Sequence, residues 1–184
     1  FCAGVGYVIS ATFIVAIVNR LPGLEGQGSW SFLAIGLAAA PACIVWDFIA
    51  RRTGVLNALI LAAVLQIVGI LRPVAVGGMA GAIAGALLFG GTFIGMVSLV
   101  LTMAGRYYPT RPAKMMGKMT LSYGAAQIIG PAVTGWLAGS MGSYAAGLYV
   151  AAAVMVVGTL LLIVLKFIEK RETAAAGLAD ISAT

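Results

Sequence analysis

The sequence predicts an all-α, polytopic membrane protein with six transmembrane helices. Of its 184 residues, 62% are hydrophobic and 9% are charged, whereas a soluble domain usually carries about 25% charged residues. The charges stand between apolar runs of roughly 20 residues, the length that crosses the hydrocarbon core of a bilayer as a helix. The chain also holds 25 Gly residues, and small residues let membrane helices approach closely. Lipid is therefore the solvent that this composition suits.

Charged residues, Pro and Gly mark where each predicted helix ends. Arg20 ends the first apolar run, and Pro22 and Gly23 indicate a loop after it. The most polar stretch, residues 106–118, is also predicted to be a loop. The expected helices cover residues 1–19, 30–50, 54–71, 79–104, 119–139 and 144–166. They form one transmembrane domain over residues 1–171, and residues 172–184 are predicted to be a disordered cytoplasmic tail.

The distribution of basic residues predicts the orientation. Two basic residues, Arg20 and Arg72, lie on one side of the expected bundle. The opposite side holds Arg51, Arg52, Arg106, Arg111, Lys114, Lys118, Lys166, Lys170 and Arg171. Because basic residues are enriched on the cytoplasmic side, we expect both ends of this segment to be cytoplasmic. A multi-pass protein of a bacterial inner membrane is the predicted location.

Composition also argues against several classes of function. The basic residues are spread between apolar runs, which is not the clustered patch of a nucleic-acid binder. The chain has no His, and Cys2 and Cys43 lack metal-type spacing, so we expect no metal and no cofactor. A membrane-embedded enzyme would need a cluster of titratable groups at one face, whereas Asp47 stands alone near the membrane. We therefore predict that the chain is not an enzyme.

A short acidic and basic motif lies between the second and third expected helices. Asp47 is followed by the pair Arg51 and Arg52 and by Gly54. A carboxylate next to basic residues at a helix end can form charge-assisted pairs that hold one conformation and break in another. We interpret Asp47, Arg51, Arg52 and Gly54 as a conformational latch. The alternative is ordinary anchoring of the basic residues at the cytoplasmic surface.

Polar residues on two expected helices are candidates for lining a central cavity. A polar side chain within a membrane has to face other helices or water, and the fifth helix carries such residues at spacings of three, four and seven. The alternative role is hydrogen bonding between helices, away from any pathway. The predicted cavity-lining residues are Tyr7, Thr12, Asn19, Thr120, Tyr123, Gln127, Pro131 and Thr134.

Three glycines share one face of the fourth expected helix. Gly81 and Gly85 have the small-xxx-small spacing that permits close helix contact, and Gly95 lies on the same face with Thr92. Tight packing is the favoured interpretation, and a flexible gate is the other.

Several segments resemble the major facilitator superfamily of transporters. DFIARRTG at residues 47–54 resembles the cytoplasmic-loop signature G-x-x-x-D-R-x-G-R-R, with Phe48 where that signature has a basic residue. SYGAAQIIGPAVTG at residues 122–135 is similar to the Gly-Pro segment of the eleventh helix. GYVISATF at residues 6–13, and Pro41 followed by Trp46 and Asp47, are similar to the YbfB/YjiJ group of that superfamily.

The resemblance implies helices seven to twelve of a twelve-helix transporter, built as a three-plus-three inverted repeat. It implies secondary active transport of a small solute by alternating access, with no cofactor. The expected partner is a missing N-terminal six-helix half, which would also hold any proton-coupling acid, because no expected helix centre here carries a carboxylate. The alternative is a complete six-helix protein, either a homodimeric half-transporter or a subunit of a membrane complex that does not transport.

Overall fold

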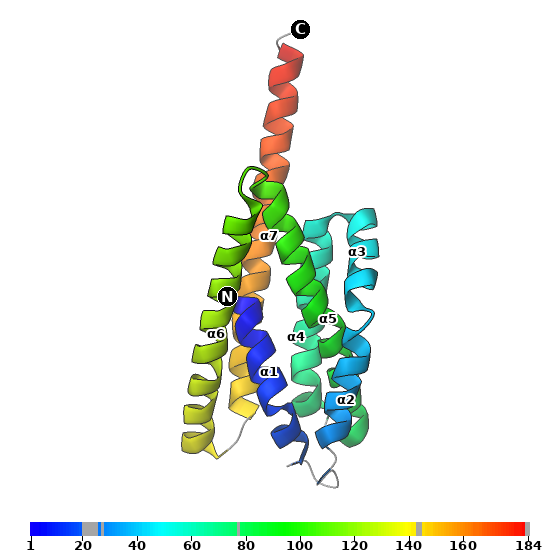
Figure 1. Cartoon of the computed structure of the whole chain (residues 1–184), viewed down its shortest axis with the longest axis vertical. Helices are drawn as coiled ribbons and strands as arrows, with labels where there is room; N and C mark the ends of the chain where they lie inside the picture. Colours follow the sequence, from blue (N-terminus) through cyan, green and yellow to red (C-terminus); the bar gives the residue numbers. More distant parts are fainter. Residues whose placement is uncertain (20–25, 27, 77, 143–144, 183–184) are drawn as a thin grey trace.

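The computed structural model describes residues 1–19, 26, 28–76, 78–142 and 145–182. Within these residues the chain forms α-helices and no strand, which confirms the predicted all-α class. Figure 1 shows the helices side by side in an elongated bundle, beyond which the end of α7 projects alone. The helices are α1 (Cys2–Asn19), α2 (Gly28–Ala39), α3 (Ala42–Thr53), α4 (Val55–Ala75), α5 (Gly78–Tyr107), α6 (Pro112–Met141) and α7 (Ala145–Ser182).

Helix length and apolarity support membrane crossing for part of the bundle. Among the described residues, Val55–Ala75, Gly78–Tyr107 and Ala145–Glu172 are each long and apolar enough to span a bilayer. The pair α2 and α3 qualifies when taken as one span, which makes up to four spans. α1 contributes a shorter apolar helix at Cys2–Val15, and α6 is not among the candidates. Six crossings therefore stay a prediction.

The second expected helix, residues 30–50, is broken in the structure. α2 ends at Ala39, α3 begins at Ala42, and the two are bent by 45°. Pro41 stands at the break as the residue before α3. Because proline has no N–H and its ring clashes with the carbonyl four residues earlier, it interrupts a helix at such a position. The uninterrupted helix that we expected is thus corrected to a broken one.

Two other expected boundaries also move. The predicted loop at residues 106–118 is short, since α5 runs to Tyr107 and α6 begins at Pro112. Proline is favoured at the first helical position, where its missing N–H would have no partner anyway. The third expected helix was to end at residue 71, but α4 continues through the buried Pro73 to Ala75.

The C-terminal segment differs from the expected disordered tail. α7 continues as a helix to Ser182, through most of residues 172–184. This segment contains several alanines, the residue with the highest helix propensity, and no proline. Helix propensity therefore extends the last helix past its apolar part.

Most of the described charges gather at one end of the bundle. The C-terminal ends of α3 and α5 and the N-terminal ends of α4 and α6 meet there, at the top of Figure 1, where α7 leaves the bundle. We call it the basic end. The opposite end includes Arg72 in the last turn of α4. The predicted loop that carries Arg20 and Glu25 lies outside the described residues.

α5 is the helix that most of the bundle packs against. It contacts α4 most extensively, then α2 and α3, with smaller contacts to α6 and α1. At the crossing with α4, a Cβ built on Gly85 would lie 2.9 Å from the Gly69 carbonyl oxygen and 2.9 Å from the Pro73 ring. Only glycine allows these two backbones to approach so closely.

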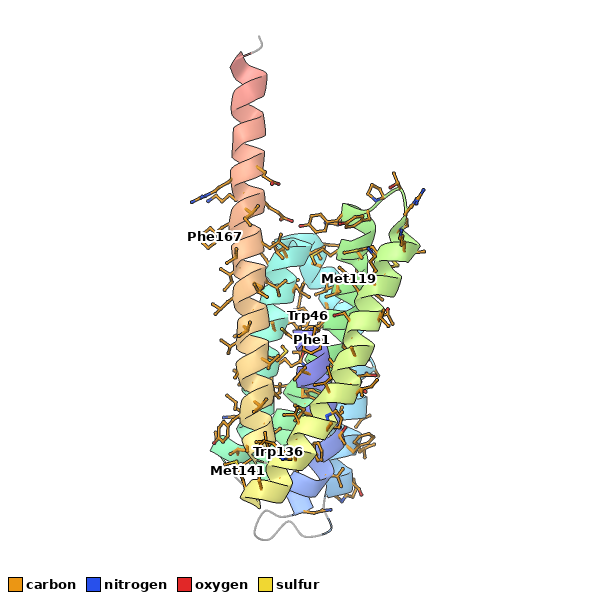
Figure 2. The ribbon with its side chains drawn as sticks, turned by 90° about the vertical axis from the view of Figure 1, so that its left-hand side faces the viewer. Phe1, Trp46, Met119, Trp136, Met141 and Phe167 are labelled. Atoms are coloured by element: carbon orange, nitrogen blue, oxygen red, sulfur yellow. The ribbon has the colours of Figure 1, made fainter. Side chains whose placement is uncertain are left out.

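Trp46 joins α3 to the same helix. Its side chain is 4% exposed, and its Nε1 donates a hydrogen bond to the Gly91 carbonyl at 2.6 Å. A Cβ built on Gly95 would overlap the indole ring. The indole therefore lies against α5 at Gly95, where any larger residue would place a side chain. Figure 2 shows Trp46 inside the bundle.

We predict that Gly95→Ala lowers the unfolding temperature of the protein in detergent. The added methyl group overlaps Trp46, and overpacking of this kind typically destabilises by about 1–3 kcal/mol. Gly91→Ala is the matched control, because its Cβ would meet no neighbour nearer than the Ala38 oxygen at 4.0 Å. Alanine should therefore be tolerated there. Equal losses in both variants would contradict the prediction.

Candidate functional site

Four aromatic rings from three helices form a continuous cluster. Tyr7 on α1 stacks on Phe93 of α5 at 4.8 Å between ring centroids and on Tyr123 of α6 at 5.9 Å. Phe89 lies 6.2 Å from Tyr7 and 5.4 Å from Phe93. These separations are typical of attractive aromatic pairs. We call these four residues the aromatic cluster.

The aromatic cluster is buried on one side and accessible on the other. Phe89 is 2% exposed, whereas Tyr7, Phe93 and Tyr123 are half-buried. The Gln127 side chain, one turn further along α6 from Tyr123, is exposed. The accessible side thus offers ring faces together with hydroxyl and amide groups and no formal charge. Such a surface can contact a small solute that has both apolar and hydrogen-bonding parts.

The predicted polar stripe of α6 is divided in the structure. Thr120 and Gln127 are exposed, and Tyr123, a member of the aromatic cluster, and Pro131 are half-buried. Thr134 is fully buried, and it lies against Gly147 of α7, where a built Cβ would overlap its side chain. Thr134 therefore packs between α6 and α7, and its expected place in a cavity stays a prediction.

The three candidates on α1 have three different environments. Tyr7 belongs to the aromatic cluster, and Thr12 is exposed. Asn19 instead accepts a hydrogen bond at its Oδ1 from the Gly28 N–H at 2.8 Å. Gly28 begins α2, whose first N–H groups have no partner within their own helix. Asn19 therefore caps the start of α2, and its expected role in lining a cavity stays a prediction.

The predicted latch residues lie together at the basic end, on α3 and just after it. Arg51 Nε is 2.8 Å from Asp47 Oδ2, one turn away on the same helix. Arg52 stacks over the ring of Phe48, with its guanidinium carbon 4.2 Å from the ring centroid. Gly54 separates α3 from α4 with φ of +90°, a conformation that favours glycine.

The Asp47–Arg51 pair is exposed and belongs to one helix. The two side chains are 57% and 77% exposed, respectively. An exposed pair of this spacing contributes only about 0.3–0.5 kcal/mol to stability. Both residues also line a cavity of about 50 Å³ with Ser98, Thr102 and Arg106 of α5. The structure thus brings the motif to the α3–α5 boundary without an ion pair between these helices among the described contacts.

The three candidate glycines lie at helix contacts. Gly85 and Gly95 meet α4 and Trp46, as described above, and a Cβ on Gly81 would lie 3.2 Å from the Val76 Cβ. Close contact at all three agrees with the packing interpretation. A role as a gate stays a prediction.

Sequence reasoning missed Phe89 and Phe93. They are four residues apart on α5, a spacing that places them on one helix face. That periodicity could have identified them, but only the fold brings Tyr7 and Tyr123 to the same face. It also missed the contact of Trp46 with α5, because a tryptophan near a helix end is equally typical of a membrane interface.

Comparisons with known proteins identify the family. A family model described as "Uncharacterised MFS-type transporter YbfB" matches residues 1–163, which is most of the chain. No curated protein and no solved structure matches the chain. MFS denotes the major facilitator superfamily, the one that the segments at residues 6–13, 47–54 and 122–135 resemble. The chain belongs to the YbfB-type family of major facilitator transporters.

Proposed function

We propose that this chain is the C-terminal, six-helix half of a secondary active transporter in a bacterial inner membrane. The transporter would move a small solute by alternating access, with both ends of this segment in the cytoplasm. Family membership supports transport in general. The observation that carries the proposal further is the aromatic cluster, whose half-buried side brings rings and polar groups from α1, α5 and α6 to one surface.

The solute would bind against this surface. Tyr7 and Phe93 would provide ring faces, while Tyr123 and Gln127 would provide hydrogen-bonding groups. The absence of formal charge on these four side chains favours a neutral solute, or a charged one whose counter-charge comes from elsewhere. Thr120, exposed two turns from Gln127 on α6, extends the polar part of the surface.

A second six-helix segment would cover the surface. α6 exposes Thr120 and Gln127, and exposed polar groups on a spanning helix have to face protein or water. We propose a preceding half of the same protein as the cover, which would also hold any proton-coupling carboxylate. A second copy of this chain, as in a homodimeric half-transporter, is the competing arrangement.

The latch would act at the basic end. Asp47 has a partner on its own helix and lines the same small cavity as Arg106 at the α3–α5 boundary. We propose that Asp47 exchanges Arg51 for a partner on another element in one of the two facing states. Each facing state would then be stabilised by a different ion pair of Asp47. Arg52 would not take part in either pair, because its guanidinium stacks on the Phe48 ring.

Alternating access predicts that Gln127→Cys can be reached from both sides of the membrane. In full-length protein with Cys2 and Cys43 replaced, an impermeant thiol reagent should label this position from the cytoplasmic side and from the opposite side. Labelling from the two sides should change in opposite directions when a transported solute binds. Inverted and right-side-out vesicles separate the two measurements.

The control position is Ile128, the next residue on α6. It is 77% exposed but points about 100° away from Gln127 around the helix. Ile128→Cys should label weakly from either side, because lipid excludes the reagent. If Gln127→Cys were labelled from one side only, both with and without the transported solute, alternating access at this surface would be contradicted.

The latch proposal predicts that Asp47→Asn alters the conformational balance while hardly changing stability. The free energy of unfolding should fall by no more than about 0.5 kcal/mol, because the lost pair is exposed. The ratio of Gln127→Cys labelling from the two sides should shift at least ~threefold, whereas a pair worth about 0.5 kcal/mol in one state alone would shift it only about twofold. Glu172→Gln, an exposed acid on α7, is the control and should leave the ratio unchanged. An unchanged ratio in Asp47→Asn would remove the latch role.

A further inference from the structure

The face of α7 that packs against α1 continues past that contact toward the basic end. A Cβ built on Gly6 of α1 would lie 2.6 Å from Met155 Cγ, and one built on Gly158 would lie 2.8 Å from Cys2 Cβ. Residues three or four apart share a helix face, so the same face of α7 goes on through three residues that line cavities. These residues are Leu162, Lys166 and Glu169.

α4 and α5 show the same arrangement. Ile70 Cδ1 of α4 lies 3.6 Å from the Cβ built on Gly6, and Phe93 of α5 stacks on Tyr7. Followed from there toward the basic end at spacings of three, four or seven, each helix presents apolar side chains that line the same cavities. They are Ala63, Leu59 and Leu56 on α4, and Met96, Val100 and Met103 on α5.

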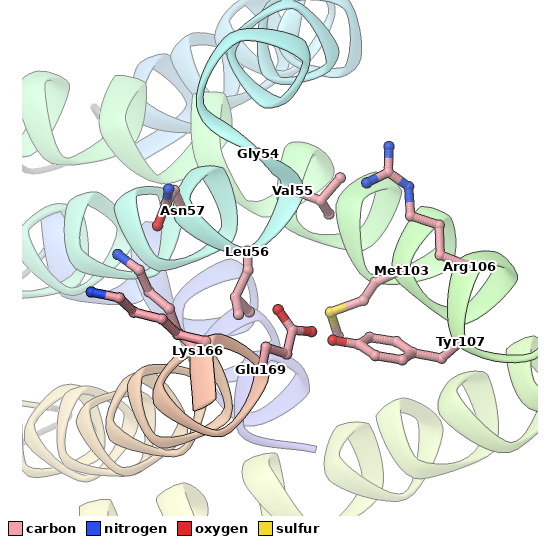
Figure 3. Close-up of a pocket in the computed structure, with 10 residues that line it drawn as sticks. Gly54, Val55, Leu56, Asn57, Met103, Arg106, Tyr107, Lys166 and Glu169 are labelled. Atoms are coloured by element: carbon pink, nitrogen blue, oxygen red, sulfur yellow. The ribbon is translucent and has the colours of Figure 1, made fainter. Parts of the chain in front are cut away.

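Two cavities between these three faces form one groove. The first, of about 200 Å³, is lined by Phe1 together with side chains of α4, α5 and α7. The second, of about 550 Å³, lies nearer the basic end, and Met103 lines both. Figure 3 shows the second cavity, with the Glu169 carboxylate between Leu56 and Tyr107. The groove thus continues the line of α1, and no described helix runs through it.

The length of α1 differs from that of its neighbours. Its apolar helix Cys2–Val15 is shorter than a bilayer span, whereas α4, α5 and α7 each contain one. Figure 2 labels Phe1 about midway along the bundle. α1 and α7 run in opposite directions, and Lys166 lies eight residues beyond Gly158, the neighbour of Cys2. About eight residues ahead of Cys2 would therefore reach the level of Lys166 and give a span of about 22 residues.

We propose that the residues preceding Phe1 continue α1 as a helix through the groove, as far as the level of Lys166. The continuation rests on the proposed function, because it requires a preceding segment of the same protein. Side chains of the added turns that face Ala63 and Leu162 are apolar, and polar side chains follow at the level of Lys166. One helix then joins the solute surface at Tyr7 to the basic end, so that a displacement at that end moves the Tyr7 ring.

Disulfide cross-linking in the full-length protein tests this register. With Cys2 and Cys43 replaced, Lys166→Cys is combined with a cysteine seven, eight or nine residues before position 2, in three separate variants. A disulfide needs Cβ atoms within about 4.5 Å, so oxidation should cross-link at least one of these pairs within a single chain. Phe167→Cys is the matched control, since it is 63% exposed and points about 100° away around α7. Its cross-linking should be at least ~tenfold slower.

Accessibility in the same protein separates a helix from other occupants of the groove. Met103→Cys should react with an impermeant thiol reagent at least ~tenfold more slowly than Tyr108→Cys, which is exposed and lines neither cavity. Protection of Met103→Cys without the cross-link would mean that acyl chains fill the groove, and a cross-link between two chains would mean that a second copy does. Either result, or equal cross-linking of Phe167→Cys, overturns the proposal.

The cross-link and the transport test can fail independently. Labelling of Gln127→Cys from both sides, without a cross-link to Lys166→Cys, would retain alternating access and remove the continuation of α1. A cross-link with Gln127→Cys labelled from one side only would retain the continuation and remove alternating access at the aromatic cluster.

Discussion

Close approach of α5 to its neighbours is the constraint on which the rest of the bundle depends. In lipid there is little hydrophobic force between helices, so association rests on van der Waals contact and on hydrogen bonds. α5 satisfies this with a different glycine for each of α4, α2 and α3. Gly85 meets α4, Gly90 meets the backbone of α2 at Ile35, and Gly95 receives the indole of Trp46 from α3. At these three contacts, the absence of a glycine side chain lets α4, α2 and α3 approach α5 closely.

The same helix carries the residues that make the candidate solute surface. Phe89 and Phe93 lie on a face of α5 that meets α1, whereas Gly90 and Gly95 face α2 and α3. The close helix contacts and the candidate solute surface therefore lie on different sides of one helix. A substitution on one side can disturb the other only by moving the helix as a whole.

Sequence reasoning predicted the parts of the fold that follow from composition and local pattern. Apolar length and charge positions indicated where helices run, and the nearness of Asp47 to Arg51 and Arg52 in the sequence indicated that a carboxylate and a guanidinium could pair, as Asp47 and Arg51 do. The broken second span was missed although Pro41 was visible, because Pro73 and Pro131 lie inside continuous helices. A proline alone does not say whether neighbouring contacts compensate for the hydrogen bond that it removes.

The candidate site was harder to predict because it depends on helix rotation. Thr134 lies on the same stripe as Tyr123 and Gln127, yet small rotations accumulate over several turns, and Gly147 leaves room for it against α7. Asn19 lies at the end of α1, and only the start of α2 beside it makes it a cap. Aromatic partners from three separate helices likewise cannot be deduced from spacing within one segment.

The break between α2 and α3 has a mechanical consequence. A bend of this kind would act as a hinge if either piece were free to swing, but each piece is fastened to α5 separately. α2 is held where the Gly90 backbone meets Ile35, and α3 is held by the hydrogen bond from Trp46 to Gly91. The fastening points are adjacent residues of one helix, so α2, α3 and α5 have few independent degrees of freedom. They are expected to translate and tilt as a single rigid body, with the bend preserved throughout.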